Sequence, residues 1–483
     1  MNLRLSQLLN SLSLILVCVV ILVVNSIRFI GLEKAPPGFQ VDELGSAVTV
    51  QCLVTEGIDA RGKRYPLFSE LNYGSPKPPT YIYPAMLWTR IFGFSIPSYR
   101  AISAFALCLA IIGLLFLGRL LGSWEHGLWA MLVATISPWM WTFSRIAYET
   151  IFCLPYLVWG VYFFLRSKNY FNAVLGGFFL ACAMYAYPPT RMHVPLMLPV
   201  LIWFFYKKNG FHWKFLITFV SIFTVTLIPL ALKLLKGDFQ SRVNQVTIFS
   251  TQYLASVGKK FCIPDLVSLV FTNYWTHFDP KFLFLRGDDN WAHSTHFVGI
   301  LSWVDDLALL VGIILLAVFL WKFFARKTSG SLHQNWIVFM ALNIAVGIIP
   351  AACTWEALPH ALRTIGAWPF VMLLTGYCLW KVSCLWGWFR WIIVILAVCF
   401  SYFYLHNYFT LYPKAAYGMF SAWTNDEIKN CKTDEDWLKF MVRYHHQDFH
   451  VRYYLMNHRG DMCTSSRQKL DAMINYLHSR GMP

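Results

Sequence analysis

The sequence predicts an all-α polytopic membrane protein, and two observations support that fold class. Of the 483 residues, 57% are hydrophobic and only 13% are charged, an apolar excess that the core of a soluble globule does not accommodate. The apolar residues also gather in successive runs, many of them near the roughly 20 residues that a helix needs to cross a bilayer. We therefore expect about 11 transmembrane helices, with interfacial helices in the first outer loop and a small extramembrane segment at the C-terminal end.

The first apolar run, residues 12–30, is expected to be an uncleaved signal anchor. No small-residue cleavage site follows it, and the short segment before it carries Arg4 as its one charged side chain. We expect the N-terminus in the cytoplasm, which places the loop after this run on the outer face.

That outer loop opens with the stretch Pro36-Pro37-Gly38-Phe39-Gln40-Val41-Asp42-Glu43, which ends in two adjacent carboxylates. A carboxylate at the membrane edge can take a proton from one substrate while another lies in the bilayer, as a lipid-dependent transferase requires. Alternatively, Asp42 only caps the helix that follows the Pro-Gly break. Both interpretations stay open on this stretch alone.

Residues 77–93 are apolar, but they are too short to span and contain Pro84 and Arg90. We interpret them as a helix that lies in the membrane interface. The later spans are then expected at residues 99–121, 124–143, 150–165, 171–187, 194–206, 215–235, 303–324, 335–352, 361–380 and 389–406. The C-terminus is expected outside.

This arrangement puts the short basic loops in the cytoplasm, as the positive-inside rule requires. The residues concerned are Arg119, Arg166, Lys168, Lys207, Lys208, Lys214, Lys322, Arg326, Lys327, Lys381 and Arg390. Topology thus accounts for the formal charge of +16, and no basic cluster with interleaved stacking residues indicates nucleic acid. The expected location is the plasma membrane, or the inner membrane of a cell that has two.

The unusual polar segments gather on the outer face. They are the first outer loop (about residues 32–98), residues 144–149, residues 187–193, a large loop of about residues 236–302, residues 355–363 and the tail after His406. Because the cytoplasmic loops are short and merely basic, function is expected outside.

Four features together resemble the GT-C superfamily of membrane glycosyltransferases. They are the Asp42-Glu43 pair after the first span, the Lys-Pro start of the interfacial helix at Lys77, Ser144-Arg145 with Glu149 just beyond, and Phe282-Leu283-Phe284-Leu285-Arg286-Gly287-Asp288. The chain looks most like the bacterial branch with the lipid A aminoarabinose transferase and relatives of protein O-mannosyltransferases, of the family 39 and 83 type. The resemblance covers most of residues 1–410, is strongest before Arg191, and leaves residues 411–483 as a separate extracytoplasmic segment.

The resemblance implies that a sugar moves from a polyprenyl-phosphate carrier to an acceptor hydroxyl at the outer face, with inversion. Asp42 is then the general base, and Lys77 meets the carrier phosphate. Glu43 lies about 100° around a helix from Asp42, so it is expected to position a ligand or a neighbouring arginine. Arg145, Arg191 and Arg363 are further outer-face cations for phosphate or for orienting Asp42. Alternatively, they contact lipid headgroups or pair with Glu149 and Glu356.

A cofactor is not expected beyond the lipid-linked sugar, and no metal ligands are assigned. The loop from Thr276 to His296 is rich in His and Asp, but their spacing is irregular and no HExxH pair occurs. Acceptor binding or a lid over the site is the preferred role of that loop. In the C-terminal segment, Cys431 and Cys463 could form a disulfide if the compartment is oxidising, and the sequence leaves open whether they pair.

Two other classes of protein remain as alternatives. A transporter or lipid flippase would need charges buried in mid-span and an internal repeat, and neither is found. A lipid-linked glycan polymerase or ligase shares the large outer loop and the arginines but does not need the Asp-Glu pair. The expected partners are the polyprenyl-phosphate sugar donor, a protein, lipid or glycan acceptor, and membrane lipids.

Overall fold

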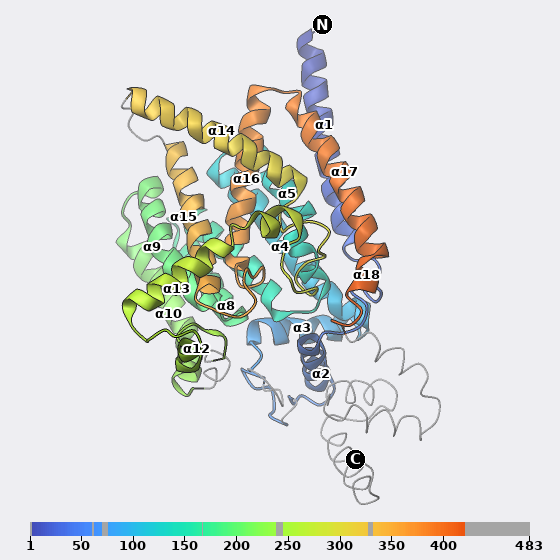
Figure 1. The fold of residues 1–483 in the computed structure, drawn as a ribbon, viewed down its shortest axis with the longest axis vertical. Helices are drawn as coiled ribbons and strands as arrows, with labels where there is room; N and C mark the ends of the chain where they lie inside the picture. The colour runs from blue at the N-terminus through green and yellow to red at the C-terminus, as the bar shows by residue number, and fades with distance from the viewer. Residues whose placement is uncertain are drawn as a thin grey trace, which may run out of the picture. The chain divides into compact units, whose positions relative to one another are not determined.

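The computed structural model describes residues 2–59, 62–69, 76–166, 168–237, 245–326 and 332–420, and these residues form helices and loops without a β-strand (Figure 1). The α-helices are α1 (Asn2–Ile27), α2 (Val41–Thr55), α3 (Pro79–Phe92), α4 (Ile96–Leu121), α5 (Trp124–Ile136), α6 (Pro138–Trp141), α7 (Cys153–Arg166), α8 (Tyr170–Ala186), α9 (Thr190–Asn209), α10 (Trp213–Leu235), α12 (Thr251–Ser256), α13 (Ile263–Thr276), α14 (Trp303–Arg326), α15 (Leu332–Ala352), α16 (Trp368–Leu385), α17 (Phe389–Thr410) and α18 (Tyr412–Ala415). Short 3-10 or π turns are η1 (Phe143–Arg145), η2 (Glu149–Phe152), η3 (Lys281–Leu285) and η4 (Ile365–Ala367).

Each span expected from the sequence overlaps an α-helix, but the one expected at residues 124–143 is divided between α5 and α6. Within the described residues, five helices are long and apolar enough to cross a membrane: Ile96–Leu121, Trp213–Leu235, Asn335–Ala352, Ile365–Leu385 and Phe389–Thr410. A sixth is obtained if Pro138–Arg145 and Glu149–Arg166, which meet at 118°, count as one broken span. The membrane character is thus confirmed, whereas the expected count of about 11 spans is not confirmed for the described residues.

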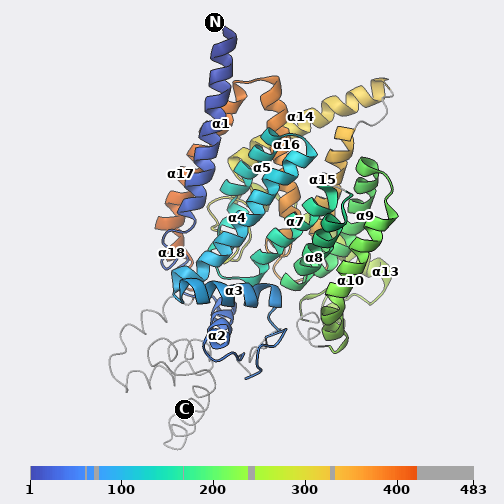
Figure 2. The ribbon, with the colours of Figure 1, turned by 180° about the vertical axis from the view of Figure 1, so that it is seen from behind.

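The segment expected in the interface forms α3, a helix of 14 residues that begins directly after Pro78. At 1.5 Å per residue it measures about 21 Å, which is short of the roughly 30 Å hydrocarbon core. Helix α3 packs on α2, and the two views show it lying crosswise to that helix (Figures 1 and 2). Its length agrees with the expectation that it does not cross.

The helices belong to two compact units. The first takes the described residues of Met1–Ile30, Ala104–Ser144 and Thr150–Asn407, and the second those of Gly31–Ser103, Arg145–Glu149 and Tyr408–Pro483. In the first unit α8 packs on α7 and α10, and α16 packs on α5. The last contact needs Gly376, because a Cβ there would lie 2.5 Å from the Ala130 backbone nitrogen.

Most of the C-terminal segment lies outside the described residues. Cys431 and Cys463, the two cysteines that could form a disulfide, are among the residues that fall there. The described part of the segment ends after α18 and one further turn.

Candidate functional site

The loop before α2 is fastened by Arg100, near the start of α4. The guanidinium donates from Nη1 to the carbonyls of Leu32 and Pro36, at 2.7 and 2.8 Å, and from Nη2 to that of Gly38. It also donates from Nε and Nη2 to the two carboxylate oxygens of Glu43, at 2.7 and 2.8 Å. Both side chains are 0% exposed. Arg100 thereby joins three backbone carbonyls and one carboxylate in a single buried network.

The same network holds the segment that follows η1. The Ala147 backbone N–H donates to Glu43 Oε1 at 3.0 Å. The Tyr81 hydroxyl donates to the Ala147 carbonyl at 2.9 Å and lies 2.7 Å from the Tyr99 hydroxyl. Side chains from α2, α3 and α4 are therefore tied to residues 145–149 by buried hydrogen bonds, which are directional and leave little freedom of position.

Asp42 and Glu43 point in different directions, as one step around a helix requires. The N-cap of α2 is Gln40, whose side chain accepts the Asp42 N–H, so the expectation that Asp42 is the cap is wrong. Asp42 is the second residue of the helix, where its charge suits the positive end of the helix dipole. Its side chain is 67% exposed, whereas Glu43 is fully buried.

Lys77 lies between two carboxylates at the start of α3. Its Nζ is 2.9 and 3.1 Å from the two Glu149 oxygens and 3.9 Å from Asp42 Oδ1, and its side chain is buried. Its backbone N–H donates to the Ser69 carbonyl at 2.8 Å, which fixes the residue before the helix begins. Burial disfavours the charge on Lys77, but Glu149 and then Asp42 outweigh that effect and raise its pKa. Lys77 therefore carries a positive charge at neutral pH.

Arg145 is buried and directed at the loop before α2. Its Nε and Nη2 donate to the Ala35 carbonyl at 3.0 and 2.9 Å, and Nη2 also reaches the Gly31 carbonyl at 3.1 Å. Its guanidinium carbon lies 5.4 and 5.0 Å from the ring centres of Tyr408 and Phe409. These contacts make Arg145 a second fastening of the loop, beside Arg100.

The remaining two expected arginines belong to the first unit. Arg363 donates to the Thr354 hydroxyl at 2.9 Å, to the Glu356 carbonyl at 2.8 Å and to the Glu356 carboxylate at 3.1 Å, so it pairs within its own loop. Arg191 donates from Nε to the Met184 carbonyl at 3.2 Å. Of the six expected site residues, Asp42, Glu43, Lys77 and Arg145 share one unit, and Arg191 and Arg363 lie in the other.

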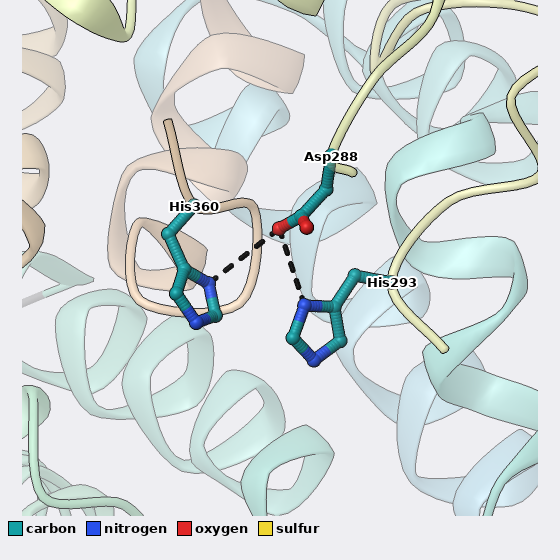
Figure 3. Close-up of side chains that lie close together, drawn as sticks. All are labelled: Asp288, His293 and His360. Atoms are coloured by element: carbon teal, nitrogen blue, oxygen red, sulfur yellow. Dashed lines mark hydrogen bonds and ion pairs between the residues drawn. The ribbon is translucent and has the colours of Figure 1, made fainter. Parts of the chain in front are cut away.

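A second cluster of chemistry-bearing side chains lies in the first unit, where Asp288 faces two imidazoles (Figure 3). Asp288 Oδ2 is 3.2 Å from His293 Nδ1 and 3.5 Å from His360 Nδ1. The same oxygen accepts the Ala361 N–H at 2.8 Å, and Oδ1 accepts the Asn290 N–H at 2.9 Å. All three side chains are buried.

Local structure places these three residues. Gly287 has φ 78°, a left-handed conformation that lets the chain turn just before Asp288. The His360 backbone N–H donates to His277 Nε2 at 3.2 Å, which anchors the loop between α15 and η4. Burial, and next the charge of His293, lower the pKa of His360 well below its usual value. Burial would raise the pKa of Asp288, but His293 and His360 outweigh it and lower that pKa.

Sequence reasoning missed Arg100, the tyrosine pair and the cluster around Asp288. Arg100 did leave a signal, because it is a charged residue near the start of a 26-residue apolar helix, where a charge calls for a buried partner. No feature of the sequence distinguishes Tyr81 and Tyr99 from the many other aromatic residues. His360 is far along the chain from Asp288, so spacing alone does not bring the two together.

No protein-family model and no curated protein matches the chain. Among solved structures it is similar to the Archaeoglobus fulgidus oligosaccharyltransferase in complex with Zn and sulfate, with a TM-score of 0.49 and 13% identity. That match covers 88% of this chain and 56% of the other. It is also similar to ArnT from Cupriavidus metallidurans bound to undecaprenyl phosphate, with a TM-score of 0.46 and 13% identity over 79% of this chain and 63% of that one.

Both proteins are membrane glycosyltransferases of the GT-C superfamily. The chain spans 56% and 63% of their lengths. Because such low identities and TM-scores carry no functional conclusion, activity, substrates and partners have to be argued from this chain's own residues.

Proposed function

We propose that this chain is an integral membrane glycosyltransferase that moves a sugar from a polyprenyl-phosphate carrier to an acceptor hydroxyl, with inversion and with Asp42 as general base. The observation that supports this proposal best is that the exposed carboxylate of Asp42 lies 3.9 Å from the buried, charged Nζ of Lys77, at the start of α3. Carrier phosphate and acceptor would meet at this charge pair.

The chemistry needs few groups. A phosphate is already a good leaving group, so transfer from it needs no general acid, only one base for the acceptor hydroxyl and a cation for the departing charge. Asp42 can act as the base because its side chain is accessible. Lys77 can act as the cation because it keeps its positive charge. Glu43 suits neither role, since it is fully buried and bonded to Arg100.

The separation between Asp42 and Lys77 also suits a base. At 3.9 Å the ammonium attracts the carboxylate without a hydrogen bond between them, so the Asp42 lone pairs stay free to accept a proton. Lys77 makes its hydrogen bonds with Glu149 instead. An ammonium has three N–H donors, so it can engage Glu149 and still offer one to a phosphate oxygen.

We further propose that the acceptor is a protein, lipid or glycan, and that the site faces outward from the plasma or inner membrane. The basic loops support this orientation. In a variant whose native cysteines are replaced, cysteine labelling in intact cells should then mark a cysteine placed at Asp289 and one near Met482 but not one at Lys207. Labelling of the Met482 end from the cytoplasmic side would overturn the assigned orientation.

The test begins with the donor. A strain that lacks this chain should accumulate its lipid-linked sugar, and mass spectrometry of the extracted lipids identifies the sugar and the carrier. The full-length protein in liposomes is then assayed with that extract. Asp42→Asn should lower turnover by about 10² to 10⁴ while carrier binding persists, because a general base contributes about that much.

Glu56→Gln, at the other end of α2, is the matched control and should keep wild-type turnover. Near-normal turnover by Asp42→Asn would refute the assignment of Asp42 as the general base. If the strain accumulates no lipid-linked sugar and the protein transfers none, the transferase proposal itself fails.

A further inference from the structure

The buried cluster of Asp288, His293 and His360 has the dimensions of a metal site. A tetrahedral ion with bonds of about 2.0–2.1 Å to nitrogen and oxygen holds its donor atoms about 3.4 Å apart. Asp288 Oδ2 lies 3.2 Å from His293 Nδ1 and 3.5 Å from His360 Nδ1, on either side of that value. All three donor atoms lie within 4.8 Å of one another, which leaves room for one ion between them.

The donor set is also chemically suited. Two imidazoles and one carboxylate are ligands that Zn²⁺ and other divalent first-row metals accept. The side chains come from two segments, the loop after η3 and the loop between α15 and η4, and converge on one point (Figure 3). Supporting hydrogen bonds fix them: Asn290 N–H holds the second carboxylate oxygen, and His277 receives the His360 N–H. Outer partners of this kind orient ligands in known metal sites.

A hydrogen-bonded Asp–His pair explains only half of the cluster. His293 Nδ1 can donate its proton to Asp288 Oδ2 at 3.2 Å. The Arg363 backbone N–H, however, points at His360 Nδ1 at 3.4 Å, which requires that nitrogen to be unprotonated. An unprotonated nitrogen then faces a carboxylate oxygen at 3.5 Å, and a cation between the two lone pairs stabilises such an arrangement.

We propose that Asp288 Oδ2, His293 Nδ1 and His360 Nδ1 bind one divalent transition-metal ion, for which Zn²⁺ is the best match, with water in the fourth position. The ion clamps the loop after η3, which carries Asp288 and His293, to the loop between α15 and η4, which carries His360. The inference departs from the expectation of no metal ligands, and it does not depend on the glycosyl-transfer proposal.

Metal content tests it directly. Tag-free, full-length protein in detergent is stripped with a chelator, dialysed against buffered Zn²⁺ and measured by inductively coupled plasma mass spectrometry. The wild type should hold about one Zn²⁺ per chain, and His293→Ala and His360→Ala should bind at least about 100-fold more weakly, since loss of even a supporting residue costs 10–100-fold. Zn²⁺ should raise the unfolding temperature of the stripped wild type, because a ligand of the folded state stabilises it.

His212→Asn is the matched control, because it changes a histidine outside the cluster, whose ring contacts the Asn209 carbonyl. His212 is the N-cap of α10, a position that asparagine favours, so the helix need not shift. This variant should keep its Zn²⁺. Should the alanine variants fail to fold, Co²⁺ added to the wild type should still give the visible absorption of a tetrahedral site. A stripped wild type that binds neither Zn²⁺ nor Co²⁺, or alanine variants that bind as tightly as the wild type, would overturn the proposal.

Discussion

The buried Glu43–Arg100 pair predicts how the loop that carries Asp42 responds to mutation. Arg100→Met keeps an apolar side chain of similar length but removes the two hydrogen bonds to Glu43 and the three to the carbonyls of Leu32, Pro36 and Gly38. It also leaves the Glu43 carboxylate buried, with the Ala147 N–H as the remaining donor described for it.

The size of the effect follows from this geometry. Removing one partner of a buried ion pair costs about 3–5 kcal/mol, because the other charge stays in a low-dielectric environment. Glu43→Gln should cost less, about 1.5–3 kcal/mol, since Arg100 keeps its three carbonyl partners and loses a charged hydrogen-bond acceptor. In the double variant neither charge is left without its partner. The destabilisation of the double variant should therefore be smaller than the sum of the two single-variant destabilisations, by about 0.5–3 kcal/mol.

The assay is unfolding of the purified full-length protein in mixed micelles, followed by tryptophan fluorescence for the wild type, both single variants and the double variant. Arg90→Met is the control, because Arg90 is an exposed residue of α3 with a single 3.2 Å hydrogen bond, to the Tyr65 hydroxyl. It should change the free energy of unfolding by less than about 0.5 kcal/mol. If Arg100→Met destabilises no more than Arg90→Met, or if the single effects simply add, Glu43 and Arg100 do not form the anchor described.

Three further predictions concern the other charged groups. Lys77→Met should weaken binding of polyprenyl phosphate by about 1.5–3 kcal/mol, and Lys77→Arg should restore the affinity only in part. Titration of each variant with free polyprenyl phosphate measures this affinity. Unchanged affinity in a folded Met variant would show that Lys77 does not contact the phosphate. The pKa of Lys77 is raised, so the stabilising effect of its charge is fully present below the ordinary lysine pKa of 10.5 and is lost only as pH rises through the higher pKa of the folded state. The difference in stability between wild type and Lys77→Met should therefore stay constant between about pH 6 and 9. A difference that shrinks within that range contradicts the raised pKa. Arg363→Gln should destabilise more than Glu356→Gln, because it removes the hydrogen bonds to the Thr354 hydroxyl and the Glu356 carbonyl as well as the pair with the Glu356 carboxylate. Neither variant should change carrier affinity, and a selective loss of carrier affinity in Arg363→Gln would instead indicate a phosphate role.

The features that the sequence predicts well are those that depend on neighbours along the chain. Helices coincide with the expected spans because apolar runs of that length determine them, and residues 77–93 form a short helix because Pro78 precedes it and its apolar stretch is brief. The different directions of Asp42 and Glu43 follow from the rotation of one residue in a helix. None of these predictions requires knowledge of which helices pack together.

The features that the sequence does not predict are long-range partners. Arg100 contacts a carboxylate and carbonyls more than 50 positions earlier, and nothing near it identifies them. The cluster around Asp288 is harder still, since two of its ligands come from one loop with irregular spacing and the third from another loop. Local pattern identifies the residue types, whereas the fold decides which of them meet.

The structure also gives a reason why the two acids Asp42 and Glu43 are adjacent in sequence. Apolar burial is non-directional, so it cannot by itself fix the position of a polar loop to within an ångström. Arg100 and Arg145 instead bind the carbonyls of residues 31–38 by hydrogen bonds of defined direction. Glu43 neutralises Arg100 inside, and the same turn of helix leaves Asp42 exposed beside Lys77. On this view Glu43→Gln should impair transfer through the position of Asp42, so its turnover should fall together with stability, whereas Asp42→Asn should lose turnover while stability is retained.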